Sequence, residues 1–206
     1  MAKWALLAVI LVSGCGGDDG DCGDAAVAGD SVATGVVCEG DFAISNSVEL
    51  EALANCKEVT GNLGIVDNDA LTSISLPLLA SVGGALYIEN NDNDALTELN
   101  FPLLASVGGY LGILRNDALT ELSLPLLASV GGAPALGGPG GHLAIVDNDA
   151  LTSISLPALA SVGGRLLFRD NAALCQSIAD ELVARVDVQG EVIAGHLDVT
   201  GNRDGC

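Results

Sequence analysis

The chain consists largely of one short unit that is repeated several times, and this repetition limits its fold more than any other feature. Residues 63–77 and 143–157 are nearly identical in sequence, and each unit continues into a Leu-Ala-Ser-Val-Gly-Gly segment. These segments end at Gly84, Gly109, Gly132 and Gly164. Pro102 and Pro125 occupy the same place in consecutive units and lie 23 residues apart. A fixed period of this size is typical of a solenoid in which each unit forms one coil.

Apolar residues alternate over short stretches of each unit, as Leu63 and Ile65 do, and this is the period of a β-strand rather than of a helix. Insertions at residues 89–94 and 133–141 are expected at the corners of the coils, where extra residues leave the stacked core intact. We therefore predict an all-β parallel β-helix, or solenoid, with coils of about 23 residues. A leucine-rich-repeat horseshoe is the alternative, because Leu-x-Ile-x-x-Asn also matches the strand of that repeat. The Gly-Gly corners and the strand-period segments on more than one side favour the β-helix.

Composition supports a single narrow core and restricts the partners of the chain. Half of the 206 residues are apolar, 3% are aromatic and 27 are glycine, so small branched side chains must fill the interior. Basic residues number 7 against 27 acidic ones, which gives a formal net charge of −20. Such a charge repels nucleic acid and anionic lipid headgroups, so we expect no nucleic-acid partner.

The amino terminus has the features of a secretion signal. Lys3 precedes an apolar run over residues 5–12, which is shorter than the roughly 20 residues of a membrane-spanning helix. The sequence Leu-Val-Ser-Gly-Cys at residues 11–15 resembles the lipobox of bacterial lipoproteins. That resemblance implies cleavage before Cys15 and acylation of its thiol and new amino group.

Three segments follow from this cleavage site. Residues 1–14 are the predicted leader, residues 15–35 a flexible acidic tether rich in Gly, Asp and Ala, and residues 36–206 the solenoid. Each acyl methylene contributes about 0.8 kcal/mol of membrane affinity, so several chains on one cysteine make a permanent anchor. We therefore expect a cell-envelope protein that is lipid-anchored to a bacterial membrane, with the outer membrane as the expected location.

An asparagine recurs as regularly as the leucines, three positions before an apolar residue. The residues are Asn68, Asn93, Asn116, Asn148 and Asn171. In stacked coils such amides donate to and accept from neighbouring backbone, so we predict a structural ladder. The aspartates around them leave calcium as an alternative, at Asp67, Asp69, Asp92, Asp94, Asp117, Asp147 and Asp149. Because the spacing matches neither an EF-hand nor a calcium-binding nonapeptide repeat, the main expectation is no cofactor.

Two early segments carry a family resemblance. Residues 38–44 read Cys-Glu-Gly-Asp-Phe-Ala-Ile, and residues 55–65 read Asn-Cys, two residues, then Val-x-Gly-x-Leu-x-Ile. These segments resemble the receptor L domain, the ligand-binding module of the insulin receptor and epidermal growth factor receptor families. The Leu-Pro-x-Leu-x-x-Val segments and the Asn-Ala-Ala-Leu-Cys sequence that ends at Cys175 fit the same pattern.

The resemblance covers about residues 36–206 and implies a right-handed parallel β-helix that is capped at both ends and binds through a sheet face. The sequence offers no cysteine-rich module, transmembrane helix or kinase, so receptor signalling is not carried over. A short helix is predicted over residues 176–186, because Ile178, Leu182 and Val186 lie four residues apart.

The cysteines are disulfide candidates because the predicted compartment is oxidising. Five remain once Cys15 is acylated, so one must stay unpaired. Cys38 and Cys56 lie 18 residues apart, less than one repeat, which places them on adjacent coils. Cys175 and Cys206 bracket the final coil in the same way. We therefore predict these two pairs and leave Cys22 unpaired.

Catalysis is not expected, because the sequence has only two histidines and no Ser-His-Asp or His-Glu-x-x-His grouping. The strongest functional candidate is instead the exposed face beside the inward Leu-x-Ile pairs. Its predicted residues are Tyr87, Tyr110, Leu114, His142, Val146, Arg165, Leu167, Arg169 and His196. Aromatic residues and cations gathered on one face of an acidic chain suggest a contact surface for a protein or glycan ligand. The alternative is a structural envelope or surface-assembly protein with no discrete ligand.

Overall fold

A computed structural model describes residues 35–68, 71–89, 96–131, 141–188 and 197–206. All the described residues belong to one compact unit, Val32–Cys206. The predicted leader, Cys15 and Cys22 lie outside the described residues, as do Asn93, His196 and nearly all of both insertions.

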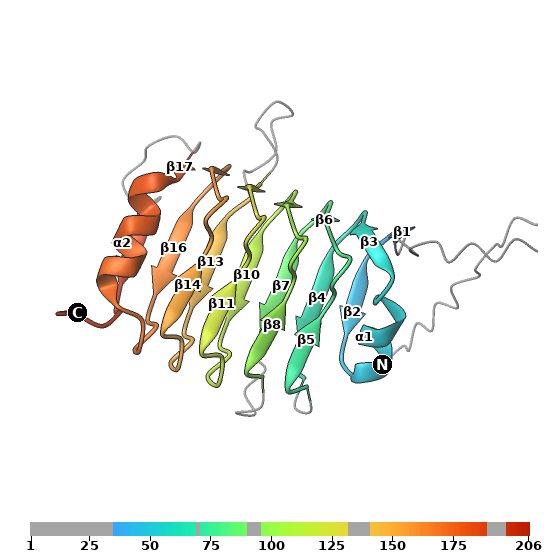
Figure 1. The fold of residues 1–206 in the computed structure, drawn as a ribbon, viewed down its shortest axis with the longest axis horizontal. Helices are drawn as coiled ribbons and strands as arrows, with labels where there is room; N and C mark the ends of the chain where they lie inside the picture. The colour runs from blue at the N-terminus through green and yellow to red at the C-terminus, as the bar shows by residue number, and fades with distance from the viewer. Residues whose placement is uncertain (1–34, 69–70, 90–95, 132–140, 189–196) are drawn as a thin grey trace, which may run out of the picture. The chain divides into compact units, whose positions relative to one another are not determined.

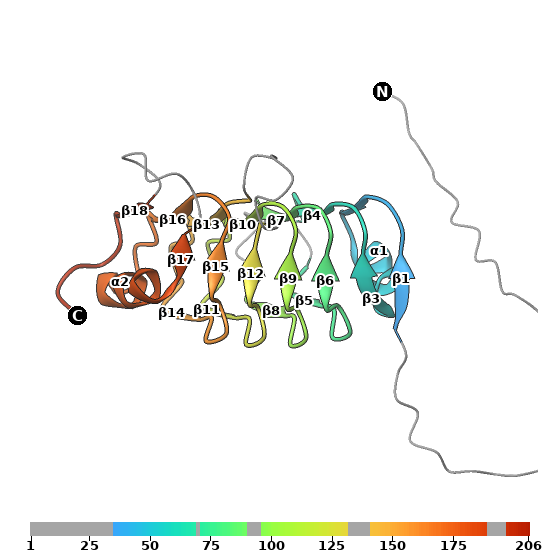
Figure 2. The same cartoon turned by 90° about the horizontal axis from the view of Figure 1, so that it is seen from above.

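Short parallel strands wind into successive coils, and two seven-stranded sheets run along different sides of the stack (Figures 1 and 2). Sheet A contains β1 (Val36–Cys38), β3 (Cys56–Val59), β6 (Ser81–Val82), β9 (Ser106–Val107), β12 (Ser129–Val130), β15 (Ser161–Val162) and β17 (Asp187–Val188). Sheet B contains β2 (Phe42–Ile44), β4 (Leu63–Val66), β7 (Leu86–Glu89), β10 (Leu111–Leu114), β13 (Leu143–Val146), β16 (Leu166–Arg169) and β18 (Leu197–Thr200).

A third side is formed by two separate pairs of strands. Strand β5 (Ser73–Ser75) pairs with β8 (Glu98–Asn100), and β11 (Glu121–Ser123) pairs with β14 (Ser153–Ser155). Parallel strands on three sides, rather than one sheet backed by helices, distinguish this all-β solenoid from the leucine-rich-repeat horseshoe.

Equivalent residues of the repeat stack directly on one another. Leu86 of β7 is in register with Leu63 of β4 on one side and with Leu111 of β10 on the other. Successive side chains of a strand point to opposite faces, so every second residue points into the interior. The register then places these inward residues of successive coils beside one another. Leu63, Leu86 and Leu111 are at most 1% exposed, and they belong to a single core that extends along the described coils.

Helices occur only at the two ends of the described coils. The helix α2 spans Gln176–Arg185, which confirms the predicted C-terminal helix within one residue at its end. The helix α1 spans Ser47–Ala52 and was not predicted, although Asn46 gives a capping signal and accepts a hydrogen bond from Glu49 N. No helix in the described part of the chain is long and apolar enough to cross a membrane.

Glycines at the corner after sheet A let consecutive coils stack backbone on backbone. The N–H of Gly108 donates to the Val82 carbonyl of the adjacent coil over 2.8 Å. A methyl group on Gly108 would lie only 2.1 Å from the carbonyl oxygen of Gly83. This corner therefore has no space for a side chain, which explains why Gly-Gly recurs in the repeat.

We expect Gly108→Ala to lower the free energy of unfolding by about 1–3 kcal/mol, because the added methyl group would clash with the Gly83 carbonyl of the adjacent coil and force a backbone shift. Gly64→Ala is the matched control, since a methyl group there would meet nothing closer than Val66 Cγ2 at 3.8 Å. Urea unfolding of both variants measures the difference. Equal stability of the two variants would contradict backbone stacking as the reason for this glycine.

Candidate functional site

Buried asparagines form a ladder at the carboxyl ends of the sheet B strands. The backbone N–H of Asn116 donates to Asn148 Oδ1 over 3.1 Å, and that of Asn148 donates to Asn171 Oδ1 over 3.2 Å. The side-chain amide of Asn148 also donates to the Ile113 and Val146 carbonyls, each over 3.0 Å. These contacts satisfy backbone groups that turn away from the sheet, so the ladder fixes the end of each strand.

The ladder extends one rung further than the sequence analysis predicted. Asn202 Oδ1 accepts from Asn171 N over 3.3 Å, and Asn202 Nδ2 donates to the Phe168 carbonyl over 3.0 Å. The signal was present, because Asn202 lies five residues after Leu197 and three after Val199, the spacing that the other described rungs have from their strands. The helix α2 interrupts the repeat between Asn171 and Asn202, and this obscured the match between the two rungs.

A left-handed residue precedes each described rung of the ladder. The backbone angle φ is +55° at Asp67, +52° at Arg115, +54° at Asp147, +55° at Asp170 and +73° at Gly201. Aspartate tolerates this region better than most residues, so several of the aspartates have a backbone reason for their position. The described residues contain no group of three or more His, Cys, Asp or Glu that could hold a metal ion. Asp69, Asp92 and Asp94 lie outside them, and calcium binding stays the alternative prediction.

The two predicted disulfides are confirmed. Cys38 on β1 bonds to Cys56 on the neighbouring β3, and Cys175 bonds to Cys206. The Cα–Cα distance is 5.8 Å in both pairs, within the usual range. Each bond therefore fastens one end of the described coils, where a coil has a neighbour on one side only.

The three sides of the solenoid carry different outward residues. Sheet A presents a row of serines, Ser81, Ser106, Ser129 and Ser161, which lie in register. The third side presents serine, glutamate and asparagine from β5, β8, β11 and β14. Sheet B alone presents tyrosine together with small and branched apolar residues. Sheet B therefore differs from the other two sides in its outward residues, and it is the side on which the predicted contact residues lie.

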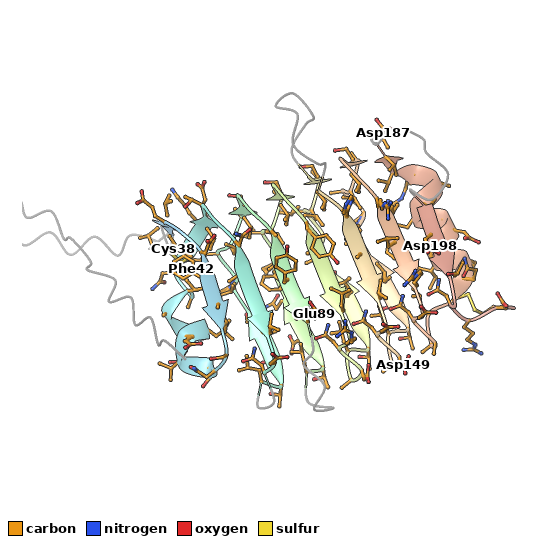
Figure 3. The ribbon with its side chains drawn as sticks, turned by 180° about the vertical axis from the view of Figure 1, so that it is seen from behind. Cys38, Phe42, Glu89, Asp149, Asp187 and Asp198 are labelled. Carbon is orange, nitrogen blue, oxygen red and sulfur yellow. A yellow bond between two sulfur atoms is a disulfide. The ribbon has the colours of Figure 1, made fainter. Side chains whose placement is uncertain are left out.

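We define the sheet B face as the outward residues of β4, β7, β10, β13 and β16 together with the residue that precedes each strand. Figure 3 looks onto this side of the molecule, where Glu89 and Asp198 are labelled. The members of the face are Asn62, Gly64, Val66, Ala85, Tyr87, Glu89, Tyr110, Gly112, Leu114, His142, Ala144, Val146, Arg165, Leu167 and Arg169.

Two tyrosines form an aromatic platform at the centre of the sheet B face. The ring centroids of Tyr87 and Tyr110 lie 5.2 Å apart at an interplanar angle of 34°. A Cβ atom on Gly112 would lie 2.3 Å from Tyr110 Cε1 and 2.7 Å from Leu114 Cδ1. The ring of Tyr110 therefore occupies the space above a glycine, with Leu114 beside it. Both tyrosines are half-buried, so the platform is supported from below and open to solvent above.

His142 extends the platform by one coil. Its ring lies 6.4 Å from that of Tyr110 in an edge-on arrangement at 83°. Its Nδ1 atom accepts a hydrogen bond from the backbone N–H of Arg165 over 2.6 Å. The imidazole therefore contacts the Tyr110 ring of the preceding coil and the Arg165 backbone of the following coil. The predicted face residues Tyr110, His142 and Arg165 thus lie on three consecutive coils.

A comparison with protein families supplies the deciding observation. The model of the family described as Receptor L domain matches residues 55–182, which is more than half of the chain. The chain belongs to the receptor L domain family. Members of this family are ligand-binding rather than catalytic domains, which is consistent with the expected non-catalytic binding module. A comparison with curated proteins gave no match.

Charges on the sheet B face of this L domain are few and mostly paired. Its charged members are Glu89, Arg165 and Arg169. Glu89 forms a salt bridge of 3.3 Å with Arg115, and Arg169 forms one of 3.2 Å with Asp198. Both bridges are solvent-exposed, so they stabilise the fold little, but they neutralise the face. The large negative charge of the chain therefore lies elsewhere.

One residue proposed for the exposed face of the L domain proved to be covered. Val146 points outward from β13 but is only 8% exposed. Its neighbour in the same strand, Ala144, is 1% exposed although it too points away from the core. Leu114 and Leu167 are half-buried, while Arg165 and Arg169 are exposed as expected. The L domain face is therefore more buried along β13 than the sequence indicated.

The hydroxyl of Tyr110 should lose its proton at an unusually high pH. Burial raises the pKa of Tyr110 to about 12, and the charges of Glu89 and Tyr87 contribute. Because the pKa of Tyr110 is higher in the folded protein than the value of about 10 in the unfolded chain, the group contributes fully to stability below pH 10. This contribution is lost as the pH rises through the folded pKa of about 12. The chain has two tyrosines, so Tyr87→Phe isolates the Tyr110 phenolate absorbance. A titration of this variant near pH 10 would contradict the burial of the hydroxyl.

Proposed function

We propose that the chain is an exported lipoprotein that is anchored in a bacterial membrane through Cys15 and binds a ligand through the sheet B face of its L domain. The observation that carries the binding proposal is the Tyr87–Tyr110 platform on the one side of the solenoid that is not lined by serine. Supported aromatic rings are favoured contact residues because they offer a large area at low entropic cost. The expected architecture is a right-handed helix with coils of about 23 residues.

The anchor is supported by the order of sequence features alone: a short apolar leader, the Leu-Val-Ser-Gly-Cys motif and a tether ahead of the domain. The outer membrane is the proposed location. The tether predicted over residues 15–35 is part of this proposal, as the segment that joins the anchor to the L domain.

Fractionation of cells tests the anchor. A Cys15→Ser protein should move from the membrane fraction to the soluble envelope fraction, whereas Cys22→Ser, the matched control, should remain with the membrane. Mass spectrometry of the mature amino terminus should show acyl groups on Cys15. A Cys15→Ser protein that stays in the membrane fraction with its leader removed would overturn the lipoprotein proposal.

Substitution of the sheet B face tests the binding proposal. The quadruple variant Tyr87→Ser, Tyr110→Ser, Arg165→Ser and Arg169→Ser should keep the fold by circular dichroism and lose binding to a partner of the wild-type protein. The serine row of sheet A supplies the control, in which Ser81, Ser106, Ser129 and Ser161 are changed to alanine. Unaltered binding by the tyrosine and arginine variant would overturn the proposed role of the sheet B face.

A further inference from the structure

Resting on the proposed binding role of the sheet B face, we propose that the ligand is an uncharged oligosaccharide whose pyranose rings stack on Tyr87 and Tyr110. Three properties of the face support this ligand: the shape of the platform, the polar groups around it and the balance of charge.

The platform has the shape that a sugar ring requires. A pyranose presents C–H groups on one face, and these pack on an aromatic ring and remove apolar area from water. The Tyr110 ring is held above Gly112, where a side chain of any size would displace it. On the other side of Tyr87 lies Gly64, at which even an added Cβ would meet only Val66 Cγ2 at 3.8 Å and the Phe42 carbonyl at 3.9 Å. The surface beside the Tyr87 ring, at Gly64, therefore carries no side chain and leaves space for a ligand.

Hydrogen-bonding groups border the rings. Glu89 lies on the same strand as Tyr87 and close enough to Tyr110 to influence the pKa of its hydroxyl. The carboxylate of Glu89 is 3.3 Å from the Arg115 guanidinium, so an acceptor and a donor lie side by side. Sugar hydroxyls both donate and accept, and a fixed pair of this kind can bind two neighbouring hydroxyls at the edge of a ring.

The charge of the whole chain, together with the paired charges of the face, disfavours ionic ligands. A formal charge of −20 disfavours uronic acids and other anionic sugars. A strongly basic ligand would be drawn to the acidic remainder of the molecule, whereas the sheet B face pairs Glu89 with Arg115 and Arg169 with Asp198. A neutral saccharide gains the stacking contact and meets no uncompensated acidic charge on this face.

The two tyrosines also provide the measurement. Trp4 lies in the leader and is the only tryptophan, so the intrinsic fluorescence of the mature full chain comes from Tyr87 and Tyr110. The full chain in detergent micelles is titrated with neutral oligomers of β-1,4-linked glucose, β-1,4-linked N-acetylglucosamine and α-1,4-linked glucose. Oligogalacturonate and oligolysine are the anionic and cationic comparison probes. Calorimetry repeats each titration at low and high salt.

We expect at least one neutral oligomer to change the tyrosine fluorescence saturably, with an affinity that does not depend on salt. Tyr87→Ser and Tyr110→Ser should each weaken this binding about tenfold. Tyr110→Phe should bind nearly as well as the wild type because it keeps the ring. Ser106→Ala on sheet A is the control and should bind with the wild-type affinity. Thermal melting of each variant confirms that the fold is retained.

Two results would overturn the inference. One is that no neutral oligomer binds saturably; the other is that neutral sugars bind equally well to both tyrosine-to-serine variants. If oligolysine or a protein partner binds through the tyrosines while the neutral sugars do not, the carbohydrate inference fails and the binding role of the sheet B face stands. If a confirmed partner ignores every substitution on the face, the proposed function itself fails.

Discussion

Replacing Asn148 with alanine is expected to lower the free energy of unfolding by about 3–5 kcal/mol, because several buried polar groups lose their partner at once. The Asn116 N–H loses the oxygen that it contacts over 3.1 Å, and the Ile113 and Val146 carbonyls each lose a donor at 3.0 Å. Asn148 is fully buried, so water does not replace these contacts without opening the turn. Denaturant unfolding followed by circular dichroism measures the loss.

Asn100→Ala is the matched control for this prediction. Asn100 is exposed on the third side, and its amide donates to Ser75 Oγ over 3.1 Å. Its removal should change the stability by no more than about 0.5 kcal/mol, as for most surface substitutions. A similar loss of stability in both variants would mean that the ladder is no more important than any surface amide contact.

Strand positions and their inward faces were predictable because the repeat displays a period of two at the same place in every unit. Leu63, Ile65 and their equivalents are in the core, and the alternation alone indicated this. The helix from Gln176 was also predictable, since its apolar spacing changes to four. These features depend on residues close together in sequence, or on residues that repeat.

The degree of exposure on the sheet B face was not predictable from the same pattern. Alternation shows which way Ala144 and Val146 point, but not that both are buried, at 1% and 8% exposed. The role of Gly112 was hidden for the same reason. Its function is to leave space for the Tyr110 ring, and the sequence does not show which way that ring turns.

Part of the aspartate pattern also had a cause that the sequence did not reveal. Asp67, Asp147 and Asp170 adopt positive φ at the turn before the ladder. An acidic residue repeated beside an asparagine resembles an ion-binding turn in sequence, whereas the same pattern meets the conformational need of the backbone. Arg115 stands at this position with φ of +52°, so the turn itself persists without an acid.

Loss of the Cys175–Cys206 disulfide is expected to lower the stability of the C-terminal end by about 4 kcal/mol, and loss of Cys38–Cys56 by about 3 kcal/mol, in the chain-entropy model. The difference arises because the two bonds close segments with sequence separations of 31 and 18 residues. Double alanine variants of each pair, unfolded in denaturant without reductant, measure both losses.

Removal of the Cys175–Cys206 disulfide should first unfold the last coil alone, before the rest of the solenoid unfolds. Strand β18 pairs only with β16, and the segment after it is held by Gln176 N donating to the Arg203 carbonyl and Arg203 N donating to the Leu174 carbonyl. Without the disulfide, this last coil is held by its pairing with β16 and by the Asn202 rung on one side only, so it should open independently of the coils beneath it. Hydrogen exchange should therefore accelerate in residues 197–206 while the amides of β10 and β13 stay protected. Cys22→Ala is the control and should change neither quantity; uniform loss of protection along all the coils would show that the solenoid unfolds as one unit instead.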